Sequence, residues 1–370
     1  MLKVFCAPAR YTQGPDATRQ LGSEIKNLGL EGPILILAGG SAVRLLEKIW
    51  VDTFAQAGLS YTVLPFSGEC TVAEIQQGRE AAVAFKARLI LGAGGGKVLD
   101  AARAIAAELE LPVVNCPTVA SSDAPCSAVS VIYSPEGLVE EYRFFRRNPD
   151  LVLVDTTLIA RSPERLLIAG MGDALATWFE AKVCAEGGVK NLRGGASTRS
   201  ALALAELCYK TLLADGLGAL QALRQQQVNE SLERLVEANT LLSGLGFESA
   251  GLAAAHAVHN GLTTAPGAQR YLHGEKVAFG VITQLLLEDQ PEAIVQEVLG
   301  FSKSVGLPIT FAEIGIPNPT ASLLETIALR TTVAGETIHH EPFPVTPQTV
   351  IAALRAADAA GAAFHRAQTL

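Results

Sequence analysis

Histidines and one acidic residue carry the clearest chemical signal in this chain. Of its six histidines, His256 and His259 lie three residues apart in an alanine-rich stretch, so a helix would place both on one face. His273 precedes Gly274 at the expected start of the next helix. Taken singly, each histidine is more simply a core or surface residue. Two of them on successive helices, together with an acid, are moderate evidence for a metal site.

Asp173 is the candidate acid. It stands among glycines and alanines in an otherwise apolar helical stretch, where burying an unpaired carboxylate costs on the order of several kcal/mol. No lysine or arginine lies one turn away, at positions 169, 170, 176 or 177. A metal ion is the simplest positive partner, and a distant arginine is the alternative.

A glycine-rich loop, Gly92-Ala93-Gly94-Gly95-Gly96-Lys97, follows an apolar stretch and opens a helical one. Glycines let the backbone approach an anion, and the first N–H groups of the helix point at it, so a pyrophosphate is a natural occupant. Lys97 stands where the dinucleotide fingerprint has its last glycine, and Val98 stands where a P-loop has Ser or Thr. A tight turn that binds nothing is the alternative. Asp100 is then either an ordinary acid near a helix start or a group facing a nicotinamide ring.

Apolar stretches and helical stretches alternate in the first part of the chain. This pattern predicts a parallel sheet covered on both faces, with strands at 33–38, 61–65, 89–92, 113–116, 129–133 and 151–155 and helices that include 72–85 and 97–109. Residues 1–8 also have the pattern of a short strand, ended by a proline.

The pattern becomes almost entirely helical after Asp155, with helices predicted at 162–184, 196–214, 229–243, 249–262, 275–288, 291–305, 320–334 and 347–367. We therefore predict an α/β dinucleotide-binding domain over residues 1–160 and an all-helical metal-binding domain over residues 161–370. A cleft between two such domains is a common place for a ligand.

Composition narrows the class of protein. A net charge of -8 argues against a nucleic-acid partner, and the tightest basic cluster, Arg143, Arg146 and Arg147, is more simply a solvated loop edge. No stretch reaches the ~18 apolar residues of a membrane span, and the N-terminus has no signal-peptide pattern. Six cysteines without a CxxC pair indicate reduced thiols. We expect a cytoplasmic protein that uses no membrane.

The sequence resembles the glycerol dehydrogenases of the iron-containing (group III) alcohol dehydrogenase superfamily. The matching segments are residues 94–100 (GGGKVLD), 117–127 (PTVASSDAPCS), 172–180 (GDALATWFE), 246–262 (GFESAGLAAAHAVHNGL) and 273–280 (HGEKVAFG). The resemblance implies a Rossmann-like, dehydroquinate synthase-like α/β domain followed by an all-α domain. It also implies a homo-oligomer, an octamer by family precedent.

The resemblance implies that Asp173, His256 and His273 bind one divalent ion, usually zinc, with iron as the alternative. Iron-dependent relatives carry a further histidine where this chain has Thr177. Three protein ligands would leave a fourth position for the substrate oxygen, as in catalytic zinc sites. His259 would then lie near the ligands without being one.

The resemblance also assigns residues to the cofactor and the substrate. Asp123 would bind a substrate hydroxyl, although a turn-forming Asp before Ala-Pro is the alternative. Phe247 would be an apolar wall of the pocket, and His256 would also face the substrate. Dinucleotide contacts are expected from Gly96, Lys97, Asp100, Thr118, Ser121, Ser127, Val129 and Tyr133.

Cofactor choice is expected to be relaxed. NAD-dependent relatives commonly carry an aspartate after the first strand, where it binds the adenosine ribose, and Gly39 stands there in this chain. Its absence removes the repulsion against a 2′-phosphate, which Ser41 or Arg44 could bind. We therefore expect use of NAD with NADP also accepted.

The activity implied is the oxidation of glycerol to dihydroxyacetone, and of related vicinal diols, with hydride transfer to NAD(P)+. A sugar-phosphate dehydrogenase or a dehydroquinate-synthase-like lyase would need several cations near the metal, and these segments offer only Lys182, Arg270 and Lys276. A non-catalytic metal- or nucleotide-binding scaffold is the rival from another class.

Overall fold

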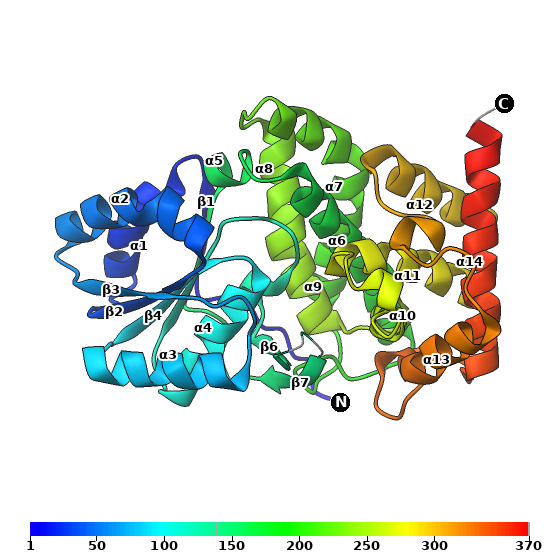
Figure 1. Ribbon diagram of the computed structural model, residues 1–370, viewed down its shortest axis with the longest axis horizontal. Coiled ribbons are helices and arrows are strands. Elements are labelled where there is room, and N and C mark those ends of the chain that lie inside the picture. Colours follow the sequence, from blue (N-terminus) through cyan, green and yellow to red (C-terminus); the bar gives the residue numbers. More distant parts are fainter. Residues whose placement is uncertain (136, 138, 369–370) are drawn as a thin grey trace. The chain divides into compact units, whose positions relative to one another are not determined.

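Six parallel strands form the central sheet of this computed structural model, which describes residues 1–135, 137 and 139–368 (Figure 1). The strand order is β1-β8-β5-β4-β2-β3. The bounds are Tyr11–Gly14 (β1), Ile34–Ala38 (β2), Tyr61–Pro65 (β3), Leu89–Gly94 (β4), Val113–Pro117 (β5) and Leu151–Asp155 (β8). A separate antiparallel pair consists of β6 (Val129–Tyr133) and β7 (Val139–Phe144). The predicted parallel α/β sheet is confirmed.

Two predictions about the strands were wrong. Residues 1–8, all of which are described, form no strand, and Lys3 makes only an isolated bridge to Ala196. The edge strand is β1, whose Tyr11 pairs with Val152 of β8. Residues 129–133 form a strand, as predicted, but in the antiparallel pair rather than in the main sheet. The strands β1 (YTQG) and β7 (VEEYRF) lack an apolar run, so the pattern missed them.

Helices cover both faces of the sheet. The side chains of Ile34 and Ile36 pack with α1 and α2, and those of Leu35 and Leu37 pack with α3 and α4. Because successive residues of a strand point to opposite faces, a strand with helices on both sides is apolar throughout. The bounds of these helices are Leu21–Asn27 (α1), Gly40–Ala57 (α2), Val72–Phe85 (α3) and Gly96–Glu108 (α4).

Strands β2 and β4 are neighbours, and Ala38 pairs with Ala93. Between these two strands, the direction in which the chain adds further strands to the sheet reverses. From β2 the chain runs through α2 to β3 at one edge, whereas from β4 it runs through α4 to β5 on the other side. Both α2 and α4 begin directly after their strands, on opposite faces. In open α/β sheets, ligands bind beyond the carboxyl ends of the strands at such a point.

Helices predominate in the described residues after Asp155, as predicted. The helices are α5 (Thr156–Ile159), α6 (Glu164–Glu186), α7 (Arg199–Arg224), α8 (Glu230–Glu237), α9 (Ser243–Ala250), α10 (Ala254–Leu262), α11 (His273–Leu287), α12 (Glu292–Val305), α13 (Ala321–Thr331) and α14 (Pro347–Gln368). No single helix of the described residues is long and apolar enough to cross a membrane. One pair bent by 103°, Glu230–Ala250 with Ala254–Leu262, passes that test when its two parts are taken together.

The break before α10 lies later than the sequence indicated. A π-helical segment, Ala238–Leu242, joins α8 to α9, so helical structure continues from Glu230 to Ala250. The chain turns at Gly251, which has a φ of 121°. A Cβ on Gly251 would lie 2.8 Å from the Sγ of Cys184, so both the conformation and the space require glycine.

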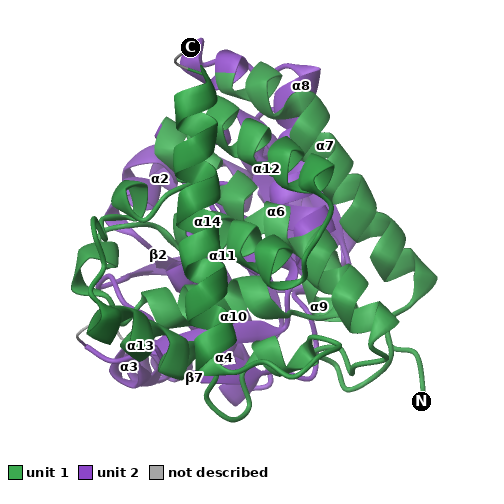
Figure 2. Ribbon diagram, turned by 90° about the vertical axis from the view of Figure 1, so that its right-hand side faces the viewer, with its two compact units in different colours: residues 1–6, 164–220, 245–370 green, residues 7–163, 221–244 purple. Residues whose placement is uncertain are grey.

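The chain divides into two compact units, drawn in two colours in Figure 2. Unit 1 comprises residues 1–6, 164–220 and 245–370, and unit 2 comprises residues 7–163 and 221–244. The sheet lies in unit 2, whereas helices α6 and α10–α14, and α7 as far as Leu220, lie in unit 1. The predicted division into domains of residues 1–160 and 161–370 stays a proposal.

Within unit 1, α6 and α11 approach each other through glycines that flank the metal candidates. A Cβ on Gly172, next to Asp173, would overlap the backbone carbonyl of Gly274. A Cβ on Gly274, next to His273, would overlap the carbonyl of Ala169. The close approach of these two backbones sets the distance between the Asp173 and His273 side chains.

We predict that Gly274→Ala destabilises the protein by about 3 kcal/mol, because the added methyl group meets backbone that cannot move without separating the two helices. Thermal unfolding measures the effect. The matched control is Gly300→Ala in α12, whose Cβ would meet only Phe364 at 3.8 Å. That change should lie within about 1 kcal/mol of neutral, on the stabilising side. Equal effects of the two changes would show that the approach of α6 to α11 is not constrained.

Candidate metal centre and cofactor site

Three ligand atoms meet inside unit 1. They belong to Asp173 of α6, His256 of α10 and His273 at the start of α11, and all lie within 4.8 Å of one another. Oδ1 of Asp173 is 3.4 Å from Nε2 of His256 and 3.0 Å from Nε2 of His273. Asp173 is fully buried, whereas 42% of the His273 side chain is exposed. The cluster is therefore accessible on the side of His273.

The cluster fits a divalent metal ion. Two ligand atoms at about 2.0–2.1 Å from a tetrahedral zinc ion lie about 3.3 Å apart, close to both separations from Asp173. Two imidazoles and one carboxylate are a donor set typical of catalytic zinc, with the fourth position left open. Position 177, one turn beyond Asp173, is a buried threonine. Among the described residues, the group of His, Cys, Asp and Glu ligands has these three members.

The charges within the cluster are strongly coupled. Burial by itself would raise the pKa of Asp173, but His273 and His256 hold that pKa well below its usual range. Burial by itself would lower the pKa of His256, but Glu180 and Asp173 raise it well above its usual value. In the metal-free protein, a proton on His256 therefore balances part of the carboxylate charge. A bound ion would displace that proton, so metal binding would release it.

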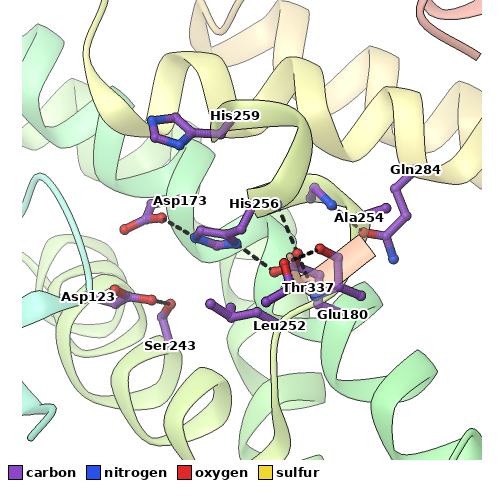
Figure 3. Close-up of polar contacts among 12 residues, drawn as sticks. Asp123, Asp173, Glu180, Ser243, Leu252, Ala254, His256, His259, Gln284 and Thr337 are labelled. Carbon is purple, nitrogen blue, oxygen red and sulfur yellow. Dashed lines mark hydrogen bonds and ion pairs between the residues drawn. The ribbon is translucent and has the colours of Figure 1, made fainter. Parts of the chain in front are cut away.

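Glu180 holds His256 in place from the other side (Figure 3). Its Oε2 atom is 2.6 Å from Nδ1 of His256, and its Oε1 atom accepts backbone hydrogen bonds of 2.9 Å from Ala253 and His256. Because a carboxylate only accepts, Nδ1 of His256 carries the proton, which leaves Nε2 free for a metal. Sequence reasoning gave Glu180 no role. The sequence feature that could have identified Glu180 is its position as a second acidic residue on α6, seven residues after Asp173 and therefore on the same face of the helix.

His259 contacts His273 and is not one of the three clustered residues. Its Nε2 atom is 3.0 Å from Nδ1 of His273, and its Nδ1 atom is 3.2 Å from Oδ1 of Asn260. Burial, followed by the positive charges of His273 and Lys276, lowers the pKa of His259 well below its usual value, so this ring is neutral. The structure places His259 where the sequence analysis expected it, and its exclusion from the ligands stays a prediction.

The predicted dinucleotide contacts all lie in unit 2. Gly96 is the first residue of α4, and the backbone N–H of Thr118 donates to the Gly94 carbonyl, so these residues meet at the carboxyl ends of β4 and β5. Lys97 Nζ lies 2.5 Å from Glu69 Oε1 and 5.1 Å from the centre of the Tyr133 ring. Ser121 and Ser127 lie between β5 and β6, and Val129 and Tyr133 belong to β6.

Asp100 has a clear structural role. One of its carboxylate oxygens pairs with Arg103, and the other accepts a 3.1 Å hydrogen bond from the backbone of Val131. Its own carbonyl accepts from Ser130 at 2.9 Å. Asp100 therefore connects α4 to β6, the strand that contains the predicted dinucleotide contacts Val129 and Tyr133. Its direct contact with a dinucleotide stays a prediction.

Asp123 and Phe247 are the predicted substrate contacts. Asp123 precedes a 3₁₀ turn, Ala124–Cys126, and its Oδ2 atom accepts a 2.8 Å hydrogen bond from Ser243 (Figure 3). Sequence reasoning missed Ser243, which is fully buried. Phe247 is a buried residue of α9. Asp123 belongs to unit 2 and Phe247 to unit 1.

Comparison with known proteins identifies the family. The profile of iron-containing alcohol dehydrogenases matches residues 8–156. A glycerol dehydrogenase of Escherichia coli O6:H1 is 48% identical over 98% of this chain and 99% of its own length, and one of Thermotoga maritima is 46% identical over 98% of each chain. The chain belongs to the iron-containing alcohol dehydrogenase family. The crystal structure of Schizosaccharomyces pombe glycerol dehydrogenase, at 36% identity, superposes with a TM-score of 0.95 and covers 99% of this chain and 93% of that one.

The resemblance inferred from the sequence is thereby confirmed, as is the class of enzyme: this family member is an oxidoreductase. The fold is that of its structural neighbours, a parallel sheet followed by helices. A further relative, 46% identical over 98% of each chain, is a glycolaldehyde reductase of Halobacterium salinarum, so relatives of this similarity include enzymes of a different named activity.

Two further acids, Glu341 and Glu288, interact with each other, and Glu341 also lies near Glu180 and the first turn of α10. Glu341 Oε1 accepts a 3.2 Å hydrogen bond from the backbone of Ala254. Burial and then the negative charge of Glu288 raise the pKa of Glu341 to about 9. Glu288 accepts 2.7 Å bonds from Gln284 and Gln290. Glu341 therefore holds a proton at neutral pH, which prevents a further negative charge beside Glu180.

We predict that Glu341→Gln becomes increasingly stabilising relative to the parent protein as pH rises. Folded Glu341 keeps its proton up to about pH 9, whereas unfolded chains lose it near the ordinary glutamate pKa of 4.5, so its contribution to stability falls across that window. The slope is at most about 1.4 kcal/mol per pH unit. The measurement is the difference in Tm between variant and parent at pH 6 and at pH 8.5. Exposed Glu325→Gln is the control, and a difference independent of pH would contradict the assignment.

Proposed function

We propose that this protein is a metal-dependent glycerol dehydrogenase, which converts glycerol and NAD(P)+ to dihydroxyacetone, NAD(P)H and a proton. The observation that carries the proposal is the cluster of Asp173, His256 and His273, with ligand atoms at metal-binding separations and one accessible side. Relatives named glycerol dehydrogenase, at 45–48% identity over nearly the whole chain, support the substrate.

Each residue of the cluster has a separate task. A divalent ion held by Asp173, His256 and His273 would act as a Lewis acid and lower the pKa of an alcohol hydroxyl. Asp173 supplies negative charge from a fully buried position, and Glu180 keeps His256 oriented with Nε2 free. Two imidazoles and one carboxylate suit either zinc or iron, and zinc is proposed because Thr177 stands where iron-dependent relatives carry a further histidine.

Asp123 is proposed to bind a hydroxyl of the substrate that does not react. Ser243 donates to Oδ2 of Asp123 and so orients its carboxylate, and an ionised carboxylate can accept several hydrogen bonds at once. Phe247 is proposed as an apolar wall. A neutral polyol suits these groups better than a phosphorylated sugar, which would need several cations.

The nicotinamide ring of a dinucleotide would accept the hydride. Its pyrophosphate is proposed to bind at the start of α4, where the N-cap residue Gly95 offers the first N–H groups no side-chain hydrogen bond. The proposed contacts are Gly96, Lys97, Asp100, Thr118, Ser121, Ser127, Val129 and Tyr133. A cytoplasmic location and assembly into a homo-oligomer stay predictions.

The decisive assay is NAD+ reduction with glycerol, with a chelator to remove the metal and Zn²⁺ to restore it. We predict that His256→Ala lowers kcat/KM by more than about a hundredfold, because the metal contributes several kcal/mol of charge stabilisation. His339→Ala, at an exposed histidine, should leave the rate unchanged. Other vicinal diols, glycerol phosphate and, in reverse, glycolaldehyde complete the panel. Turnover of glycerol phosphate with none of glycerol would overturn the proposed substrate, and activity that resists chelation would overturn the proposed metal.

Cofactor choice gives a second prediction. Gly39 caps α2 directly after β2, with a φ of -70° and nothing within 4 Å of an added Cβ, so a side chain fits there without strain. The parent protein should prefer NAD over NADP by less than about a thousandfold, roughly 4 kcal/mol, in kcat/KM. Gly39→Asp should lower kcat/KM for NADP by about tenfold or more, because the carboxylate repels a 2′-phosphate.

Gly39→Asn is the matched control for this prediction, since it adds the same volume without the charge. It should change the NADP rate less than Gly39→Asp does. If both variants affect NAD and NADP alike, Gly39 does not face the ribose.

A further inference from the structure

A chain of hydrogen bonds leads from the metal candidates to a distant carboxylate. Nδ1 of His273 lies 3.0 Å from Nε2 of His259, whose Nδ1 lies 3.2 Å from Oδ1 of Asn260. The amide nitrogen of Asn260 donates to both oxygens of Glu336, at 3.2 and 3.4 Å. Glu336 in turn pairs with Arg330 near the end of α13. All five residues belong to unit 1.

Glu336 determines which atom donates and which accepts at each hydrogen bond of this series. A carboxylate can only accept, so the nitrogen of the Asn260 amide must face it and the oxygen must face His259. That oxygen accepts a hydrogen bond from Nδ1 of His259, so the proton of this neutral ring is on Nδ1 and Nε2 has a lone pair. This lone pair accepts a hydrogen bond from Nδ1 of His273, so a neutral His273 keeps its proton on Nδ1 and presents Nε2, which faces Asp173, as the atom that can bind a metal ion.

We propose that Glu336 is a positioning residue that selects the metal-binding tautomer of His273 through Asn260 and His259. The inference rests on the proposed metal site and extends it. Glu180 orients His256 by direct contact, and Glu336 has the same effect on His273 over three hydrogen bonds. Neither acid is itself a member of the clustered ligands.

Burial makes this route effective. His259 and Asn260 are both buried, so bulk water cannot readily replace a lost partner or support the opposite proton direction. Arg330 pairs with the carboxylate of Glu336, so the acceptor at the end of this series is itself held in place.

The first test is the metal affinity of Glu336→Ala, measured for Zn²⁺ and Co²⁺ by competition with a chelator. We expect a loss of about 10–100-fold, the usual effect of removing a group that orients a metal ligand. Glu325→Ala, which removes an exposed acid from α13, is the charge-matched control and should bind as the parent does. The Co²⁺ absorption spectrum and the ¹⁵N shifts of labelled His273 report its tautomer independently of activity.

Asn260→Asp provides a rescue. In the Glu336→Ala background, this change puts a carboxylate directly against His259, where it restores an acceptor that sets the same proton direction. The double variant should recover most of the lost affinity, which a purely structural role of Glu336 does not predict. Should Glu336→Ala fail to fold, Glu336→Gln keeps the volume and should show a smaller loss in the same direction.

The outcomes separate this inference from the proposed function. If the parent protein binds neither ion, the proposed metal site and with it this inference are wrong. If the parent binds tightly while Glu336→Ala matches Glu325→Ala in affinity and spectrum, the metal site stands and the positioning role is wrong. A loss of affinity that Asn260→Asp does not restore also overturns the relay.

Discussion

Unit 1 is organised around the burial of the Asp173 carboxylate. It lies in the apolar helix α6 with no exposed surface, and an unpaired charge there would cost several kcal/mol even after relaxation (order of magnitude). Positive charge must therefore reach it from other elements. His256 lies on α10 and His273 on α11, and both contact Asp173 on α6. The positions of these three helices therefore depend on one carboxylate. Removing either imidazole would both weaken a metal site and leave this charge less compensated.

Small residues make that convergence possible. Imidazole and carboxylate side chains are short, so their ligand atoms meet only if the helix backbones approach closely. Gly172 and Gly274 allow this for α6 and α11, and Gly280 allows it for α10 and α11, since a Cβ there would overlap the carbonyl of Ala255. The glycines and alanines around Asp173 and His256 thus allow the helix backbones to approach closely. Larger side chains at these positions would push the helices, and with them the metal ligands, apart.

Local patterns explain which features could be predicted. Apolar strands such as β2 and β4 are visible because both of their faces are buried, and the ligands stand in recognisable segments. The polar strands β1 and β7 were missed because edge strands need no apolar run. The roles of Glu180 and Glu336 were missed because each acts on a partner 76 residues away. Such pairings depend on tertiary packing, which a single sequence does not display.

Charge balance explains why the two histidines are oriented differently. A divalent ion would be neutralised by Asp173 together with Glu180, which lies against His256. A third carboxylate placed directly against His273 would leave net negative charge in a buried region and would favour a protonated imidazole over a metal-binding one. A neutral imidazole and an amide transmit the proton direction without adding charge. The negative charge that determines this direction sits at Glu336, where Arg330 balances it. The proton held by Glu341 follows the same rule, because it too limits the charge around Glu180.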